Sequence, residues 1–120
     1  MTYQSLDPVT HLLLVKAIDG LQLRQEYIAQ NIANASTLNY TPVRVSFEQV
    51  LKAAKDDGIG VISQLQPRVY EDPDARGEGV RLDMELVSAS EAALRFSGLI
   101  EVLGRHFALQ RLLVSANGRS

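Results

Sequence analysis

Two heptad repeats, one near each end of the chain, constrain the fold more than any other feature. The first has spacings of four and three residues with one polar interruption, and comprises Leu14, Ile18, Leu21, Gln25, Ile28, Ile32 and Ala35. The second has the same spacings and comprises Leu82, Leu86, Ala89, Ala93, Phe96, Ile100, Leu103, Phe107, Gln110 and Val114. This periodicity predicts two long helices, each with an apolar face that requires a partner helix.

The N-terminal helix has a recognisable start. Asp7 can cap a helix whose first residue is Pro8, because proline at that position loses no hydrogen bond that it needed. At a rise of 1.5 Å per residue, the segment 8–34 spans about 40 Å. Asp19 and Gly20 are its weak point, since glycine disfavours a helix interior and the pair can also form a turn. This pair is therefore the point at which the helix could kink.

The C-terminal helix carries apolar residues on more than one side. A second flank widens its apolar face and consists of Leu99, Val102, Leu109 and Leu113. We therefore expect this helix to contact more than one neighbour. Gly98 and Gly104 lack side-chain bulk and would allow the backbone of another helix to approach closely.

Composition supports helix packing and excludes several function classes. The 120 residues suit one domain, 46% of them are apolar, and only 6% are aromatic, with no Trp. The absence of cysteine removes disulfides, thiolate catalysis and cysteine-based metal centres. A net charge of −2 gives no global basic field, so binding to nucleic acid is not expected.

The sequence predicts neither a membrane span nor a cleaved export signal. The segment 1–8 has no basic or apolar region of signal-peptide type, and no window approaches 18 apolar residues. We therefore expect a cytoplasmic protein, or one exported by a route that reads no cleavable signal.

The middle of the chain, residues 36–80, shows no helical periodicity. It contains prolines, glycines and clusters of charge, with short β-prone pieces at 40–47, 60–65 and 68–70 and a possible short helix at 47–55. We expect this segment to be irregular, partly β-prone or disordered, and mobile in the isolated chain. The predicted fold is all-α and a single domain overall: an N-terminal helix within 1–35, the central segment 36–80, and a C-terminal helix within 81–120, the helices pairing as a coiled coil or helical hairpin.

No pattern in the chain indicates catalysis. Neither His11 nor His106 is followed, three or four residues later, by a histidine or carboxylate that would complete a metal-ligand pair. Gly77-Glu78-Gly79 is best explained as a turn, and Asp83 and Glu85 as charges that complement the dipole at a helix start. We therefore predict no enzyme activity, no cofactor, no metal and no small-molecule substrate.

Polar amides accompany the end of the first repeat. Asn31 and Asn34 lie three residues apart beside Ile28 and Ile32. Amides that flank a heptad seam can fix the register between helices, as a buried polar residue does in coiled coils. Register control matters most in a repeating assembly.

This amide-rich segment resembles the N-terminal signature of flagellar basal-body rod proteins, a family related to hook and hook-associated axial proteins. The resemblance covers residues 10–52 and 77–115 and is carried by Arg24-Gln25-Glu26, Asn31 to Thr37, Tyr40, Val45-Ser46-Phe47-Glu48, Val80, Leu82-Asp83, Glu85-Leu86, Ala92 to Phe96 and Phe107-Ala108-Leu109. The chain departs from the family pattern at Leu38-Asn39, Glu78-Gly79 and Arg81.

The resemblance implies a structural subunit of the flagellar rod in the periplasmic space. Such subunits leave the cell through the flagellar type III export apparatus and assemble with other rod subunits and basal-body components. The residues expected to form the assembly interface are Leu14, Ile18, Leu21, Ile28, Asn31, Ile32, Asn34, Leu86, Phe96, Ile100, Leu103 and Phe107. Alternatives are another axial rod component, or a cytoplasmic helical adaptor or chaperone that binds other helices through the same surfaces.

Overall fold

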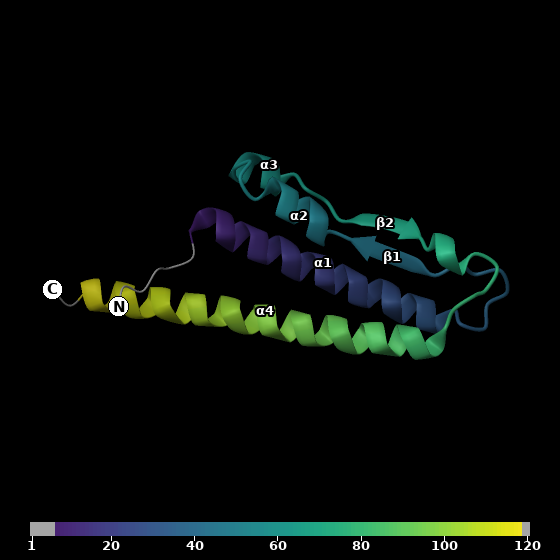
Figure 1. Ribbon diagram of the computed structural model, residues 1–120. Coiled ribbons are helices and arrows are strands. Elements are labelled where there is room, and N and C mark those ends of the chain that lie inside the picture. The colour runs from purple at the N-terminus through teal and green to yellow at the C-terminus, as the bar shows by residue number, and fades with distance from the viewer. Residues whose placement is uncertain (1–6, 119–120) are drawn as a thin grey trace.

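The computed structural model describes residues 7–118 and is elongated, measuring 67 × 27 × 20 Å. Two long helices, α1 (Pro8–Ala33) and α4 (Leu82–Asn117), run antiparallel, and the central segment lies along the opposite side of α1 (Figure 1). The outer ends of the predicted helical regions, 1–6 and 119–120, lie outside the described residues. The predicted pairing of the terminal helices within a mostly helical chain is confirmed.

The start of α1 follows the predicted capping. The Asp7 carboxylate accepts a hydrogen bond of 2.7 Å from the Thr10 backbone N–H, and Pro8 is the first helical residue. The helix continues through Gly20 without a break. A Cβ at Gly20 would lie 2.5 Å from carbon atoms of the Phe47 ring. The glycine therefore serves a close approach, in which an aromatic ring packs directly against the helix backbone.

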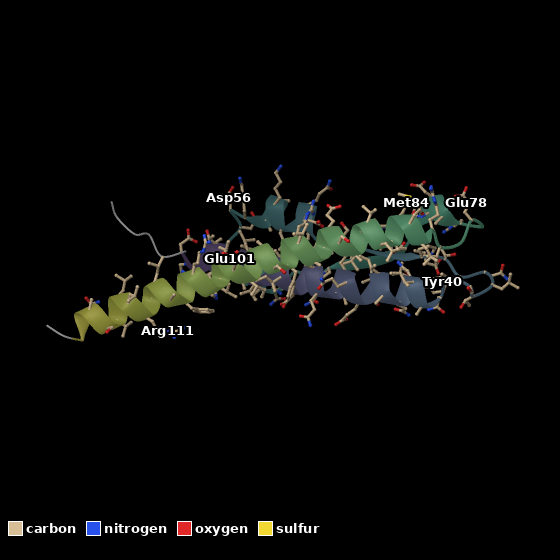
Figure 2. The ribbon with its side chains drawn as sticks, turned by 90° about the horizontal axis from the view of Figure 1, so that it is seen from below. Tyr40, Asp56, Glu78, Met84, Glu101 and Arg111 are labelled. Carbon is tan, nitrogen blue, oxygen red and sulfur yellow. The ribbon has the colours of Figure 1, made fainter. Side chains whose placement is uncertain are left out.

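α4 is longer than α1 and extends beyond it. Its 36 residues span about 54 Å, against about 39 Å for the 26 residues of α1. At the closed end of the hairpin, Tyr40 lies near Met84, and Arg111 lies far away on the projecting part of α4 (Figure 2). A Cβ at Gly98 or Gly104 would meet no described atom within 4 Å. The close helix approach expected at these glycines therefore does not occur within the chain.

The central segment is regular, which corrects the expectation of an irregular or disordered middle and of an all-α fold. It forms β1 (Val43–Ser46), α2 (Glu48–Ala54), α3 (Ile59–Ser63), β2 (Arg68–Glu71) and a 3₁₀ turn η1 (Pro73–Ala75). The strands pair antiparallel, with Val43 opposite Glu71 and Ser46 opposite Arg68. The β-prone pieces predicted at 40–47 and 68–70 are confirmed, because they contain β1 and most of β2. The short helix predicted at 47–55 is confirmed as α2, whereas the β-prone piece 60–65 is mostly helical.

The main hydrophobic core lies between α1, the central segment and α4. Its buried members are Leu21, Ile28, Val45, Phe47, Leu51 and Ala92. They come from α1, β1, α2 and α4, with Phe47 capping α2, so the sheet and the short helix share one core with the hairpin. This shared burial explains the order of the middle: its apolar residues are few, but they pack onto α1.

Candidate functional site

A buried polar cluster at the closed end of the hairpin is centred on Asn31, which has no exposed surface. Its side-chain oxygen accepts hydrogen bonds from the Val43 N–H and from the Tyr40 hydroxyl, both at 2.9 Å. Its amide nitrogen donates to the Val43 carbonyl at 3.0 Å and to Glu85 Oε2 at 3.3 Å. The Asn31 amide thus pairs with Val43 as a neighbouring strand would, and joins α1, β1 and α4. Through Glu85, the amide beside the seam thus lies at the contact between the two long helices.

Glu85 supplies the charge of this cluster. Its side chain is only 1% exposed, and its Oε1 lies 2.7 Å from a guanidinium nitrogen of Arg44 on β1. Arg44 also donates from Nε to Asp72 Oδ2 at 3.0 Å, next to β2. Burial opposes the charge on Arg44, but hydrogen bonds to Asp72 and Glu85 outweigh it and raise the pKa of Arg44. The pairing compensates the cost of burying the carboxylate.

Tyr40 feels the same negative charge. Burial raises the pKa of its phenol, and the nearby Glu85 carboxylate raises it further. The phenol is therefore held neutral, as a donor to Asn31.

A second polar junction connects α1, α2 and α4 around Glu48. Arg24 donates to both Glu48 carboxylate oxygens, at 2.7 and 2.6 Å, and to the Val45 carbonyl at 2.6 Å. Arg95 on α4 lies 3.5 Å from Glu48 and 2.7 Å from Glu91. Hydrogen bonds from Arg24 lower the pKa of Glu48, although burial opposes this shift. Arg24 also stacks over the Phe47 ring at 4.7 Å, so one residue anchors both polar and apolar packing.

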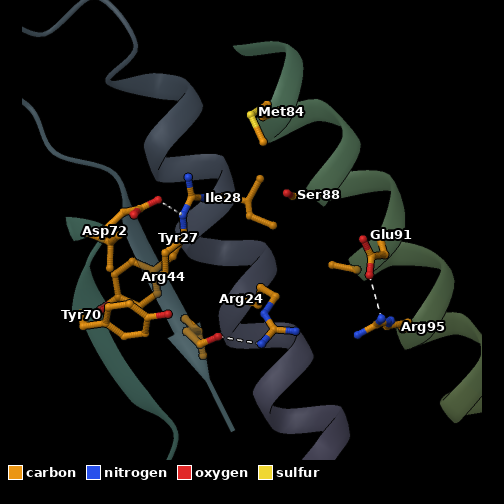
Figure 3. Close-up of a pocket in the computed structure, with 13 residues that line it drawn as sticks. Arg24, Tyr27, Ile28, Arg44, Tyr70, Asp72, Met84, Ser88, Glu91 and Arg95 are labelled. Atoms are coloured by element: carbon orange, nitrogen blue, oxygen red, sulfur yellow. Dashed lines mark hydrogen bonds and ion pairs between the residues drawn. The ribbon is translucent and has the colours of Figure 1, made fainter. Parts of the chain in front are cut away.

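The space between these two polar groups forms a cavity of about 380 Å³ (Figure 3). Arg24, Arg44 and Arg95 line it, together with Tyr27, Tyr70 and Ser88. Each of the three guanidinium groups already has a carboxylate partner. The cavity therefore presents balanced charge, and its side chains form structural ion pairs.

The two histidines meet at the open end of the hairpin. The ring centroids of His11 and His106 lie 5.5 Å apart, and Phe107 lies within 6 Å of both. Sequence spacing missed this neighbourhood because the residues belong to opposite ends of the chain. Among residues 7–118, no group of three or more histidines and acidic residues is placed to hold a metal ion.

The structure divides the predicted interface residues into three groups. Those on α1 face inward: Ile18, Leu21, Ile28 and Asn31 are buried, and Leu14, Ile32 and Asn34 are half-buried. On α4, Phe96 and Leu103 are half-buried. The others on α4 are exposed, with Leu86 58%, Ile100 43% and Phe107 45% accessible. The predicted set therefore contains both the inner surface of the hairpin and part of its outer surface.

The buried face of α4 differs from the predicted heptad line. Both contain Ala89, Phe96 and Leu103. At the other positions the structure buries the residue before each predicted one: Glu85, Ala92 and His106 in place of Leu86, Ala93 and Phe107. The polar residues Glu85 and His106 occupy this line because they meet Asn31, Arg44 and His11. Hydrophobicity alone selects the neighbouring line of larger apolar residues, which the structure leaves exposed.

The exposed line forms an outer stripe on α4, defined as Leu86, Ala93, Ile100 and Phe107, spaced seven residues apart. On the opposite flank of α4, an apolar groove runs over α1 towards α2. This groove, called the α2 groove below, is lined by Leu13, Ala17, Leu21, Phe47, Leu51, Leu99 and Val102. These two apolar surfaces are the candidate functional site.

Comparison with known proteins gives no assignment. Neither a protein-family model nor a curated protein matches this sequence. None of the helices within residues 7–118 combines the length and apolar character that a membrane span requires.

Proposed function

We propose that this protein is a structural subunit of the bacterial flagellar basal-body rod, in its proximal part. In this role, copies polymerise through their terminal helices with other axial proteins and form a hollow drive shaft. The flagellar type III apparatus exports the chain for this purpose. The partners of the chain are thus other rod subunits and basal-body components.

The observation that carries the proposal is the outer stripe of an elongated helical hairpin. Its three large side chains are roughly half exposed, and together with Ala93 they form a line that repeats every seven residues. An apolar line of this kind on a soluble helix marks a surface for another helix. A catalytic role has no comparable support, because the charged side chains of the cavity are already paired with each other.

The residues that resemble rod proteins also lie where the hairpin is held together. Asn31, Tyr40 and Glu85 form the buried polar cluster. Phe47 and Glu48 form the second junction with Arg24. The resemblance therefore falls on residues that set the shape of the hairpin and the direction in which its outer stripe points.

The first test is mass spectrometry of detergent-purified hook-basal bodies from the source bacterium. Peptides of this chain should be present at a few copies per particle when quantified against hook and rod subunits. Recovery of the chain in the cytosol, with none in the particles, would contradict the proposal and favour a cytoplasmic helical adaptor.

A matched pair of variants tests the outer stripe itself. Ile100→Asp places a charge on the stripe, whereas Leu94→Asp places the same charge on α4 outside the stripe, at a side chain that is 75% exposed. We expect Ile100→Asp to abolish rod assembly and swimming while the chain is still synthesised, and Leu94→Asp to retain both. Full motility of Ile100→Asp would count against the assembly role of the stripe.

A further inference from the structure

The α2 groove has the form of a receptor for a helix. It comprises two adjoining hollows of about 470 and 430 Å³ that share the apolar Ala17, Phe47 and Leu99 and, at the rim, Glu48, which is paired with Arg24. From Thr10 to Leu21, it follows α1 for about 16 Å, or three helical turns. Its floor is apolar, and grooves of this type bind the apolar face of an amphipathic helix.

The outer stripe matches this groove in length and in chemistry. Stripe residues seven positions apart lie about 10.5 Å apart along the axis, so the groove accommodates two of them in succession. Ile100 and Phe107 are such a pair, and both are large and roughly half exposed.

Charge at the rim of the groove also matches the stripe. Lys52 and Lys55 lie beside the groove and are exposed, and neither forms an ion pair within the described part of the chain. Next to the stripe stand the acidic Asp83 and Glu101, both exposed, whose ion pairs are with the exposed Arg81 and Arg105 of their own chain. A helix that presents Ile100 to the groove brings Glu101 towards these lysines.

The two surfaces lie on opposite flanks of α4, so one chain cannot join them to each other. Val102 lines the groove, whereas Ile100 belongs to the stripe; two residues correspond to a rotation of about 200° around the helix. We propose that the α2 groove binds the outer stripe of α4 from a second copy of this chain. Each copy then offers a groove on one flank and a stripe on the other, and copies pack side by side.

Such a contact is heterologous and continues from copy to copy. Unlike surfaces that meet in this way generate a ring or a helical array, and not a closed dimer. The half-exposed Phe107 offers roughly 100 Å² and the whole stripe on the order of 300–400 Å². This is well below the roughly 800 Å² per partner of a stable interface, so one contact alone is weak. In an array each copy makes two such contacts, one through its groove and one through its stripe, which links this inference to the proposed function.

The absence of cysteine from the chain allows a direct test with single introduced cysteines. Ala93→Cys marks the stripe, Val102→Cys marks the groove, and Ala29→Cys marks an exposed position of α1 as control. One variant of each mixture carries a size tag, and a short bis-maleimide cross-linker is added to concentrated purified protein. On a denaturing gel, dimers that join two different variants then separate from dimers that join two copies of the same variant.

We expect the mixture of Ala93→Cys and Val102→Cys to give several times more mixed dimer than Ala29→Cys with Val102→Cys. The yield of this mixed dimer should also exceed the yield of dimers formed from two copies of the same variant. Adding Ile100→Asp to the Ala93→Cys chain should reduce the mixed dimer to the control level. A yield equal to the control overturns the inference. Predominant stripe-to-stripe dimers overturn it as well, because they indicate a symmetric contact.

This test is independent of the flagellar assignment. Cross-linking between groove and stripe in a chain that is absent from basal bodies would refute the proposed function and leave the contact standing. A chain present in basal bodies that gives only control yields would refute the contact and leave the function standing.

Discussion

Replacing Asn31 by alanine removes the centre of the buried polar cluster. The variant loses the bonds to the Val43 N–H, the Val43 carbonyl, the Tyr40 hydroxyl and Glu85. A neutral hydrogen bond contributes about 0.5–1.5 kcal/mol, and a buried group left without its partner costs more. Three neutral bonds and one longer bond to a carboxylate therefore predict a loss of about 3–5 kcal/mol in the free energy of unfolding.

Urea denaturation followed by circular dichroism at 222 nm measures this loss. Asn34→Ala is the matched control: the same residue type three positions further along, whose side chain bonds only locally, to Gln30 and Thr37. It should cost no more than about 1 kcal/mol. Equal losses in the two variants would refute the reasoning that the cluster stabilises the hairpin.

Asn31→Asp separates the donor function of the amide from its size. The aspartate keeps both acceptor bonds, but it loses the two donors and places a carboxylate beside Glu85 Oε2, which now lies 3.3 Å from the amide nitrogen. Like charges at this distance repel strongly away from water. At pH 7 the aspartate variant should be at least as unstable as the alanine variant, and a near-native stability would show that Glu85 does not sense this position.

Two further predictions concern packing and pH. Gly20→Ala should lower stability by roughly 1–3 kcal/mol, because the added Cβ meets the Phe47 ring. Gly98→Ala places its Cβ in open space and should raise stability by up to about 1 kcal/mol. Thermal unfolding of both variants measures the difference. Glu48 has a lowered pKa, so its contribution is present above its ordinary value near 4.5 and is lost as the pH falls through the folded value. Glu48→Gln should therefore weaken the protein at pH 7, by less than about 1 kcal/mol for this half-exposed group, and this deficit should shrink as the pH falls below 4.5. A deficit that stays constant with pH in urea titrations would contradict the assignment to its charge.

The N-terminal half of the hairpin could be predicted because local signals agree there. Asp7 and Pro8 define the start of α1, and Ile18, Leu21 and Ile28 are the large apolar residues of one face. Local propensity and tertiary packing select the same residues, so periodicity was sufficient. A structural role for Asn31 could also be predicted, because an amide beside an apolar seam is a recognised means of fixing register.

The inner face of α4 could not be predicted from periodicity. Large apolar residues occupy several of its sides, so more than one heptad line satisfies the pattern equally well. The choice depends on Glu85 and on His106, whose partners Arg44 and His11 are distant in the sequence. In the middle of the chain, local signals indicated the two strands at 40–47 and 68–70 but not their pairing, because β1 and β2 pair across the intervening α2 and α3.

The polar cluster also explains why the outer stripe remains outside. A modest rotation of α4 would turn Leu86 inward in place of Glu85 and bury more apolar surface against α1. That rotation would separate Glu85 from both Arg44 and Asn31. Hydrogen bonds to charged groups contribute about 1.5–3 kcal/mol each, so losing both outweighs the roughly 1–2 kcal/mol that a half-exposed leucine gains on burial. We infer that the cluster selects the orientation of α4 that keeps Leu86, Ile100 and Phe107 accessible, so that the hairpin retains an apolar surface for its neighbours.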